Sequence, residues 1–141
     1  MNTEDFVTYE QALALKKLGF DEKCLFAYNE NVTLIPHHYT CDGTVYTTDL
    51  YCSSNKHYYK DKDFCDAPTL AHAQKWLIKE KKYYVNPDAD ISDVWLWEIV
   101  NLRNSNLICM WNQPNQHNHY NSYEKALSAG ITECLKMLKN N

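Results

Sequence analysis

The sequence predicts an α+β fold in which an antiparallel sheet carries about three helices packed on one face. Three stretches show the apolar spacing of an amphipathic helix, and each begins at a residue that caps helices well. Between them lie short runs of β-branched and aromatic residues separated by polar turns. The expected order of elements is αββ, a long loop, and αβββα, which favours helices on one face of the sheet.

The first helix is expected over 9–18. Thr8 is a good N-cap, and Gln11 follows three residues later, as in a capping box. Gly19 supplies the left-handed residue that commonly ends a helix.

A hairpin is expected next. Strands over 24–28 and 32–35 flank the polar turn 29–31, and Pro36 is expected to end the second strand. Together with the first helix this hairpin makes the αββ part of the chain.

The second helix is expected to begin after Thr69, which can cap it, and to end in a run of lysines. Its buried face is formed by Leu70, Ala73, Trp76 and Leu77. A short strand over 83–85 follows, and Asn86-Pro87 is expected to end it.

Three elements complete the chain. A strongly apolar strand is expected over 94–100, with 107–111 as its hairpin partner. The last helix begins after the N-cap Ser122 and keeps an unbroken apolar face to Leu138. Gly130 lies on that face, where it allows the helix to approach the sheet closely.

Length and composition favour one domain over 1–141. A chain of 141 residues is of ordinary domain size, and its hydrophobic and charged fractions, 45% and 23%, are typical of globular proteins. The acidic start and the absence of a long apolar run predict a protein that stays in the cytoplasm, with no membrane association. The net charge of −4 and the presence of a single arginine, Arg103, argue against nucleic acid as a partner.

Residues 37–66 form an unusual segment, rich in Cys, His and Tyr and without clear periodicity. Apart from a short strand expected over 45–48, it is predicted to be a long surface segment within the domain, and such segments are often functional. Exposed tyrosines give large contact areas at low entropy cost. The candidate binding residues are therefore Tyr46, Tyr51, His57, Tyr58 and Tyr59.

A zinc site is the sharpest chemical alternative in this segment. Cys41, Cys52, His57 and Cys65 would supply the four ligands of a tetrahedral site. Their spacings include no Cys-x-x-Cys knuckle, so the prediction is that no metal or other cofactor is bound. With no signal sequence, the six cysteines are expected to be free thiols, and Cys109 and Cys134 to be small core residues.

Motifs for catalysis are missing from the sequence. It contains no Gly-x-Ser-x-Gly, no P-loop and no Gly-x-Gly-x-x-Gly, and it has three glycines in total. We therefore expect a protein without enzymatic activity and with no catalytic residues.

Three motifs carry a family resemblance. They are Thr8–Ala12 followed by Leu18–Glu22, Cys65–Thr69 running to Trp76, and Ser122–Ala126 with Gly130-Ile131. Together they resemble small uncharacterised proteins of phages and mobile elements of Bacteroidetes. The resemblance implies a phage or mobile-element origin and no particular activity.

Two functions are therefore expected. The first is a non-enzymatic module that binds a host or phage protein; one version is a phage-encoded inhibitor of a host defence protein. The alternative is a binder of nucleic acid or a nucleotide, because the αβββα order of 69–138 matches the double-stranded-RNA-binding domain. That domain grips phosphates with lysines at the start of its second helix, where this chain has Lys125 beside Glu124.

Overall fold

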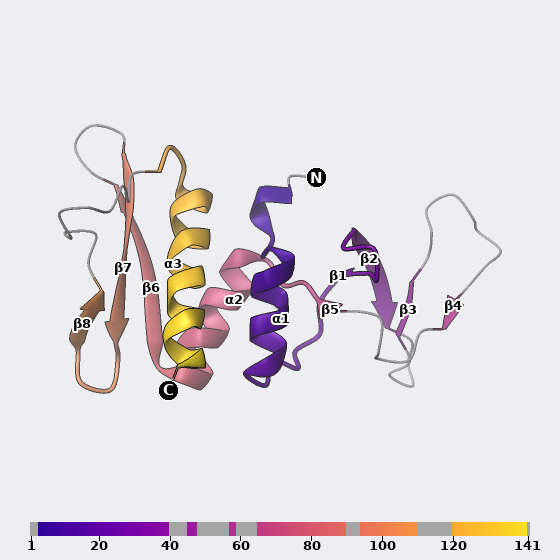
Figure 1. Cartoon of the computed structure of the whole chain (residues 1–141), viewed down its shortest axis with the longest axis horizontal. Helices are drawn as coiled ribbons and strands as arrows, with labels where there is room; N and C mark the ends of the chain where they lie inside the picture. Colours follow the sequence, from indigo (N-terminus) through magenta and orange to yellow (C-terminus); the bar gives the residue numbers. More distant parts are fainter. Residues whose placement is uncertain are drawn as a thin grey trace. The chain divides into compact units, whose positions relative to one another are not determined.

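The structure is a computed structural model that describes residues 3–39, 45–47, 57–58, 65–89, 94–109 and 120–140. The chain divides into two compact units: unit 1 is Met1–Val7 with Thr69–Asn141, and unit 2 is Thr8–Pro68. The α+β class is confirmed, because the described residues form three α-helices and two small antiparallel sheets (Figure 1). The expectation of one domain over 1–141 stays a prediction.

Unit 2 consists of one helix followed by a five-stranded sheet. Its elements are α1 (Tyr9–Lys17), β1 (Phe26–Tyr28), β2 (Leu34–Tyr39), β3 (Val45–Thr47), β4 (His57–Tyr58) and β5 (Cys65–Asp66). The strands are ordered β4-β3-β2-β1-β5, and every neighbouring pair is antiparallel. The central strands β1 and β2 form the predicted hairpin.

The capping box predicted for the first helix is present. The backbone N–H of Gln11 donates to Thr8 Oγ1 at 3.2 Å, and the Thr8 N–H donates to Gln11 Oε1 at 2.8 Å. These bonds satisfy two donors that helix geometry leaves free. Gly19 ends the helix with φ 100, a conformation that glycine adopts without a steric penalty.

The prediction that Pro36 ends the second strand is wrong, because β2 continues to Tyr39. The Asn29 N–H donates to Thr33 O, so Asn29 and Thr33 form a hydrogen-bonded pair. Hydrogen-bonded and non-hydrogen-bonded pairs alternate along an antiparallel ladder. The pair of Phe26 with Pro36 is therefore not hydrogen-bonded, and the nitrogen of Pro36 faces away from β1. On its other side, β3 pairs with β2 only from position 37 onward. Within the described pairing no ladder bond is lost at Pro36, and the strand can pass through it.

Unit 1 has the order αβββα preceded by a short helix. Its elements are η1 (Thr3–Asp5), α2 (Leu70–Trp76), the π-helical turn η2 (Leu77–Lys81), β6 (Tyr83–Ala89), β7 (Trp95–Asn101), β8 (Asn106–Cys109) and α3 (Tyr123–Lys139). The three strands form an antiparallel sheet in the order β6-β7-β8. Thr69 caps α2 and Ser122 caps α3, as predicted.

The core of unit 1 lies between α3 and the sheet, because α3 packs on β6 and β7 (Figure 1). The helix contributes buried residues at the predicted spacing: Ala126, Leu127, Gly130, Ile131, Cys134 and Leu135. The sheet contributes Val85, Trp97 and Ile99, and the predicted apolar face of α2 is also buried. The prediction of Cys134 as a small core residue is therefore confirmed.

The prediction that Asn86-Pro87 ends the strand is also wrong, because β6 runs to Ala89. The carbonyl of Val85 accepts a hydrogen bond from Gln74 Nε2 at 2.7 Å and so points away from β7. Two residues further on, the nitrogen of Pro87 points the same way, and the pairing of Pro87 with Trp97 loses no ladder bond.

Candidate functional site

The strands of unit 2 hold three of the five predicted binding residues. Tyr46 lies in β3, and His57 and Tyr58 form β4. Tyr51 and Tyr59 lie outside the described residues. The register pairs Tyr46 directly with Tyr58, so two of the predicted positions are brought side by side by backbone pairing.

Two rows of paired positions cross these three strands. One row is His38, Tyr46 and Tyr58, and the next is His37, Thr47 and His57. Directly opposed positions lie on the same face of a sheet, and neighbouring rows alternate between faces. His37 and His38 were not among the predicted binding residues, but their position in β2 adds them to the same small sheet.

The four residues considered as an alternative zinc site are not brought together as a set. His57 is in β4 and Cys65 is in β5, which are the two edge strands of the five-stranded sheet. Four strand spacings separate them, roughly 19 Å in a flat sheet, whereas two ligands of one zinc ion lie within about 4 Å of each other. Cys41 and Cys52 lie outside the described residues, and the described residues hold no group of three or more candidate ligands.

The described thiols of unit 2 are buried and protonated. Cys24 and Cys65 are buried and take part in no disulfide, and burial together with Asp66, Glu22 and Cys65 raises the pKa of Cys24 to about 12. Burial also raises the pKa of Cys65, although Lys16 acts in the opposite direction. A thiolate is the nucleophile in cysteine chemistry, so neither group is suited to that role at neutral pH.

Two apolar side chains of unit 2 are strongly exposed. Leu25, immediately before β1, is 76% exposed, and Val32, in the β1–β2 turn, is 50% exposed. Leu25 directly precedes Phe26, which the register pairs with Pro36 of β2. Sequence reasoning assigned Leu25 to a strand and Val32 to the start of another, and so missed both as surface residues.

The turn that carries Val32 is tightly bonded. Asn29 Oδ1 accepts from the N–H groups of Asn31 and Thr33, each at 2.9 Å, and the Val32 N–H donates to Asn29 O at 2.9 Å. Val32 has φ 59, a left-handed conformation that a β-branched residue rarely adopts. The turn therefore holds an apolar side chain in solvent on a strained backbone.

A polar chain lies on the sheet of unit 1. The Tyr84 hydroxyl donates to Asn86 Oδ1 at 3.1 Å, and Asn86 Nδ2 donates to Glu98 Oε1 at 2.8 Å. These positions alternate with Val85, which faces α3, so the chain occupies the opposite face of the sheet. Each polar group has a partner, which is the arrangement expected of a structural network.

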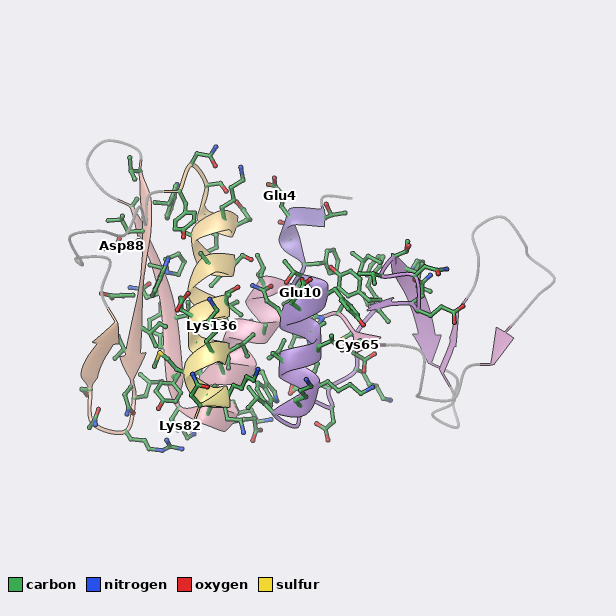
Figure 2. The ribbon with its side chains drawn as sticks, in the orientation of Figure 1. Glu4, Glu10, Cys65, Lys82, Asp88 and Lys136 are labelled. Atoms are coloured by element: carbon green, nitrogen blue, oxygen red, sulfur yellow. The ribbon has the colours of Figure 1, made fainter. Side chains whose placement is uncertain are left out.

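The order αβββα of unit 1 is the arrangement that motivated the nucleic-acid alternative. In a double-stranded-RNA-binding domain the start of the second helix supplies lysines to phosphates. In α3 that turn holds Glu124 and Lys125, and Asp88 lies at the same end of unit 1 as the start of α3 (Figure 2). The described charges at this end are therefore mixed rather than basic.

No family model matches this sequence, and no curated protein and no solved structure matches it. Among the described residues, none of the helices is both long enough and apolar enough to span a bilayer. The fold and the candidate site thus define a small α+β protein, and its function has to be argued from its surface.

Proposed function

We propose that this protein is a non-enzymatic protein-binding module that contacts its partner through unit 2. The contact surface consists of Leu25 with the strands β2, β3 and β4. The observation that carries the proposal is the exposure of Leu25, the most exposed large apolar side chain among the described residues.

Burial of Leu25 by a partner would supply useful binding free energy. Covering a leucine side chain is worth about 1.5–3 kcal/mol. The same unit carries the paired positions Tyr46 and Tyr58, and tyrosine is enriched at protein interfaces because it combines a large apolar ring with a polar hydroxyl.

The proposal that the module is not an enzyme is supported by its thiols. Cys24, Cys65 and Cys134 have raised pKa values because they are buried. Nucleophilic catalysis requires the opposite shift or an adjacent base.

The resemblance to phage and mobile-element proteins suggests which partners to test first. One version of the proposal is a phage-encoded inhibitor of a host defence protein, acting in the bacterial cytoplasm. Inhibition by a small protein requires only that its surface cover a functional surface of the target, so a protein of this size is sufficient.

The experiment compares affinity capture from bacterial host lysate by the wild type, Leu25→Ser and Val32→Thr. Leu25→Ser is expected to lose the captured partner, while Val32→Thr, an exposed apolar-to-polar change in the same unit, is expected to retain it. Circular dichroism should show both variants folded, since both side chains are exposed. Capture that Leu25→Ser leaves unchanged, or no capture by the wild type, would contradict the proposal.

The nucleic-acid alternative has the αβββα order of unit 1 in its favour. It predicts binding of double-stranded RNA through the start of α3, and therefore a loss of affinity in Lys125→Gln. Fluorescence anisotropy with a labelled RNA duplex at two salt concentrations tests this alternative, because phosphate contacts make affinity fall steeply with salt.

A further inference from the structure

The helix α2 of unit 1 ends through two uncommon backbone conformations. Its continuation η2 is a π-helical turn, and the N–H of Lys82 donates to the carbonyl of Leu77 across it. Lys82 itself is left-handed, with φ 62. Glycine is the usual residue at such a position, and π turns and left-handed non-glycine residues concentrate at functional sites. Lys82 thus takes an uncommon conformation at the end of this helix.

Basic side chains gather at this end of unit 1. We name Lys79, Lys81, Lys82 and Arg103 the basic end; Lys79, Lys82 and Arg103 are exposed. Lys81 is half-buried, with its Nζ 5.6 Å from the centre of the Trp76 ring. Residues 79–82 and the β7–β8 turn contain one carboxylate between them, that of Glu80, whose Oε1 lies 3.6 Å from Lys79 Nζ.

One backbone hydrogen bond joins the β7–β8 turn to Lys82, the residue that ends the π turn, and a second bond orders the β7–β8 turn itself. The Leu102 N–H donates to the carbonyl of Lys82 at 2.8 Å, and the Arg103 N–H donates to Asn101 Oδ1 at 3.0 Å. Leu102 and Lys82 are therefore neighbours whose backbones are already ordered. Preorganisation of this kind lowers the entropy lost on binding.

An apolar side chain is exposed among these charges. Leu102 is 43% exposed, although it adjoins Lys82 and Arg103. Acidic side chains lie at the opposite end of the unit: Figure 2 shows Asp88 and Glu4 there, while Lys82 is at the basic end. The end of unit 1 that carries Lys82 is thus more basic than the end that carries Asp88, in a chain whose net charge is −4.

We propose that the basic end binds an acidic segment of a partner protein, with carboxylates on Lys82 and Arg103 and an apolar side chain against Leu102. This surface belongs to unit 1, so the inference goes beyond the contact proposed for unit 2. A protein segment is favoured over nucleic acid because a phosphate backbone offers Leu102 no apolar group. Three of the four basic residues, moreover, are lysines, which act as point charges without the planar fork that reads base edges.

The probe is a fluorescein-labelled peptide with four glutamates on each side of one leucine, and a second peptide has serine in place of that leucine. Anisotropy at 50 and 150 mM NaCl gives the affinity of the full chain for both. The variants are Lys82→Gly, Arg103→Gln and Leu102→Ser. The matched control is Lys125→Gln, an exposed lysine at the other end of unit 1. Lys82→Gly removes the charge and also relieves the left-handed strain, so weaker binding cannot be ascribed to unfolding.

The wild type is expected to prefer the leucine peptide, and Lys82→Gly and Arg103→Gln should each weaken its binding about three- to tenfold. Leu102→Ser should abolish the preference for leucine over serine, while Lys125→Gln should change the affinity less than about twofold. Three results would overturn the proposal: no binding at 50 mM NaCl, an equal effect of Lys125→Gln, or equal affinity for a single-stranded DNA oligonucleotide of the same charge. The last result would make the basic end a general polyanion site.

Discussion

Gly130 of α3 lies against Val85 of β6 so closely that a methyl group at 130 would stand 2.5 Å from Val85 Cγ1. The same methyl group would meet Trp97 Cβ at 3.2 Å. Gly130 is fully enclosed by the sheet, and the close approach of helix and sheet expected from the sequence is confirmed at this residue.

Gly130→Ala should therefore destabilise unit 1. Alanine favours a helix over glycine by about 1 kcal/mol, but overpacking a closed core costs about 1–3 kcal/mol, and a Cβ 2.5 Å from Val85 Cγ1 is a steric clash that forces a neighbour to shift. Urea unfolding measures the difference. Adding Val85→Ala should restore part of the loss, giving a coupling free energy of about 1 kcal/mol or more.

Gly19→Ala is the control for the double-mutant comparison of Gly130→Ala with Val85→Ala. Nothing lies within 4 Å of a methyl group at 19, and its cost would come from φ 100 alone. No truncation of a neighbour should rescue it. Gly130→Ala proving as stable as the wild type would show that the helix can move away from the sheet.

Cys134 should make the stability of unit 1 fall at high pH. Burial raises the pKa of its thiol to about 12 from 9.0. Between these values the unfolded thiol ionises and the folded one does not, so the stabilising contribution is complete below pH 9 and is lost as the pH rises toward 12. The slope is at most about 1.4 kcal/mol per pH unit for one thiol.

The measurement is the free energy of unfolding of the wild type and Cys134→Ala from pH 7.5 to 10.5. Lysines and tyrosines titrate in both proteins, so the difference between them isolates the thiol. We expect the advantage of the wild type to shrink above pH 9. A difference that stays constant over this range would mean that the thiol ionises in the folded protein as it does in the unfolded one.

The helices were predictable from the sequence because their signals are local. Thr8, Thr69 and Ser122 each cap the helix assigned to them, and the apolar faces of α2 and α3 are buried as expected. Strand ends at Pro36 and Pro87 were not predictable, because the effect of a proline depends on which way its nitrogen faces, and this is set by pairing with a distant strand. The pairing of Tyr46 with Tyr58 is non-local in the same way, and no pattern within 37–66 encodes it.

Exposed apolar residues escaped sequence reasoning for a related reason. Leu25 and Leu102 look like ordinary strand or turn residues in the sequence, and only the fold shows that nothing described covers them. Lys82 was expected at a helix end, but its left-handed backbone depends on the π turn before it.

Val32→Gly should stabilise unit 2. A left-handed residue with a Cβ costs about 1–2 kcal/mol, and glycine removes that cost, although its greater freedom when unfolded offsets part of the gain. The matched control Val32→Thr keeps the branched Cβ and should leave stability unchanged. Thermal unfolding followed by circular dichroism should show a higher midpoint for glycine alone, and a lower midpoint would mean that the valine side chain stabilises the turn.

Deleting 40–62 should leave unit 2 folded but abolish its binding to a partner. The deletion removes β3 and β4, which pair only with β2 and with each other. It leaves β1 paired with β2 on one side and with β5 on the other, since Tyr28 is opposite both Leu34 and Cys65.

The new connection must run from Tyr39 to Cys65. Cys65 lies level with Leu34, which is five residues before Tyr39 along β2, and two strand spacings separate β2 from β5 across the sheet. Together these distances give a span of roughly 19 Å. A flexible Gly/Ser linker of about ten residues has a root-mean-square length of about 17–19 Å and fits this distance. The deleted chain should keep a single cooperative urea transition and the helical circular dichroism of the wild type, and it should lose the partner captured through Leu25. Loss of the cooperative transition would show that β3 and β4 are needed for folding, and the proposed contact surface would then be a structural part of the sheet.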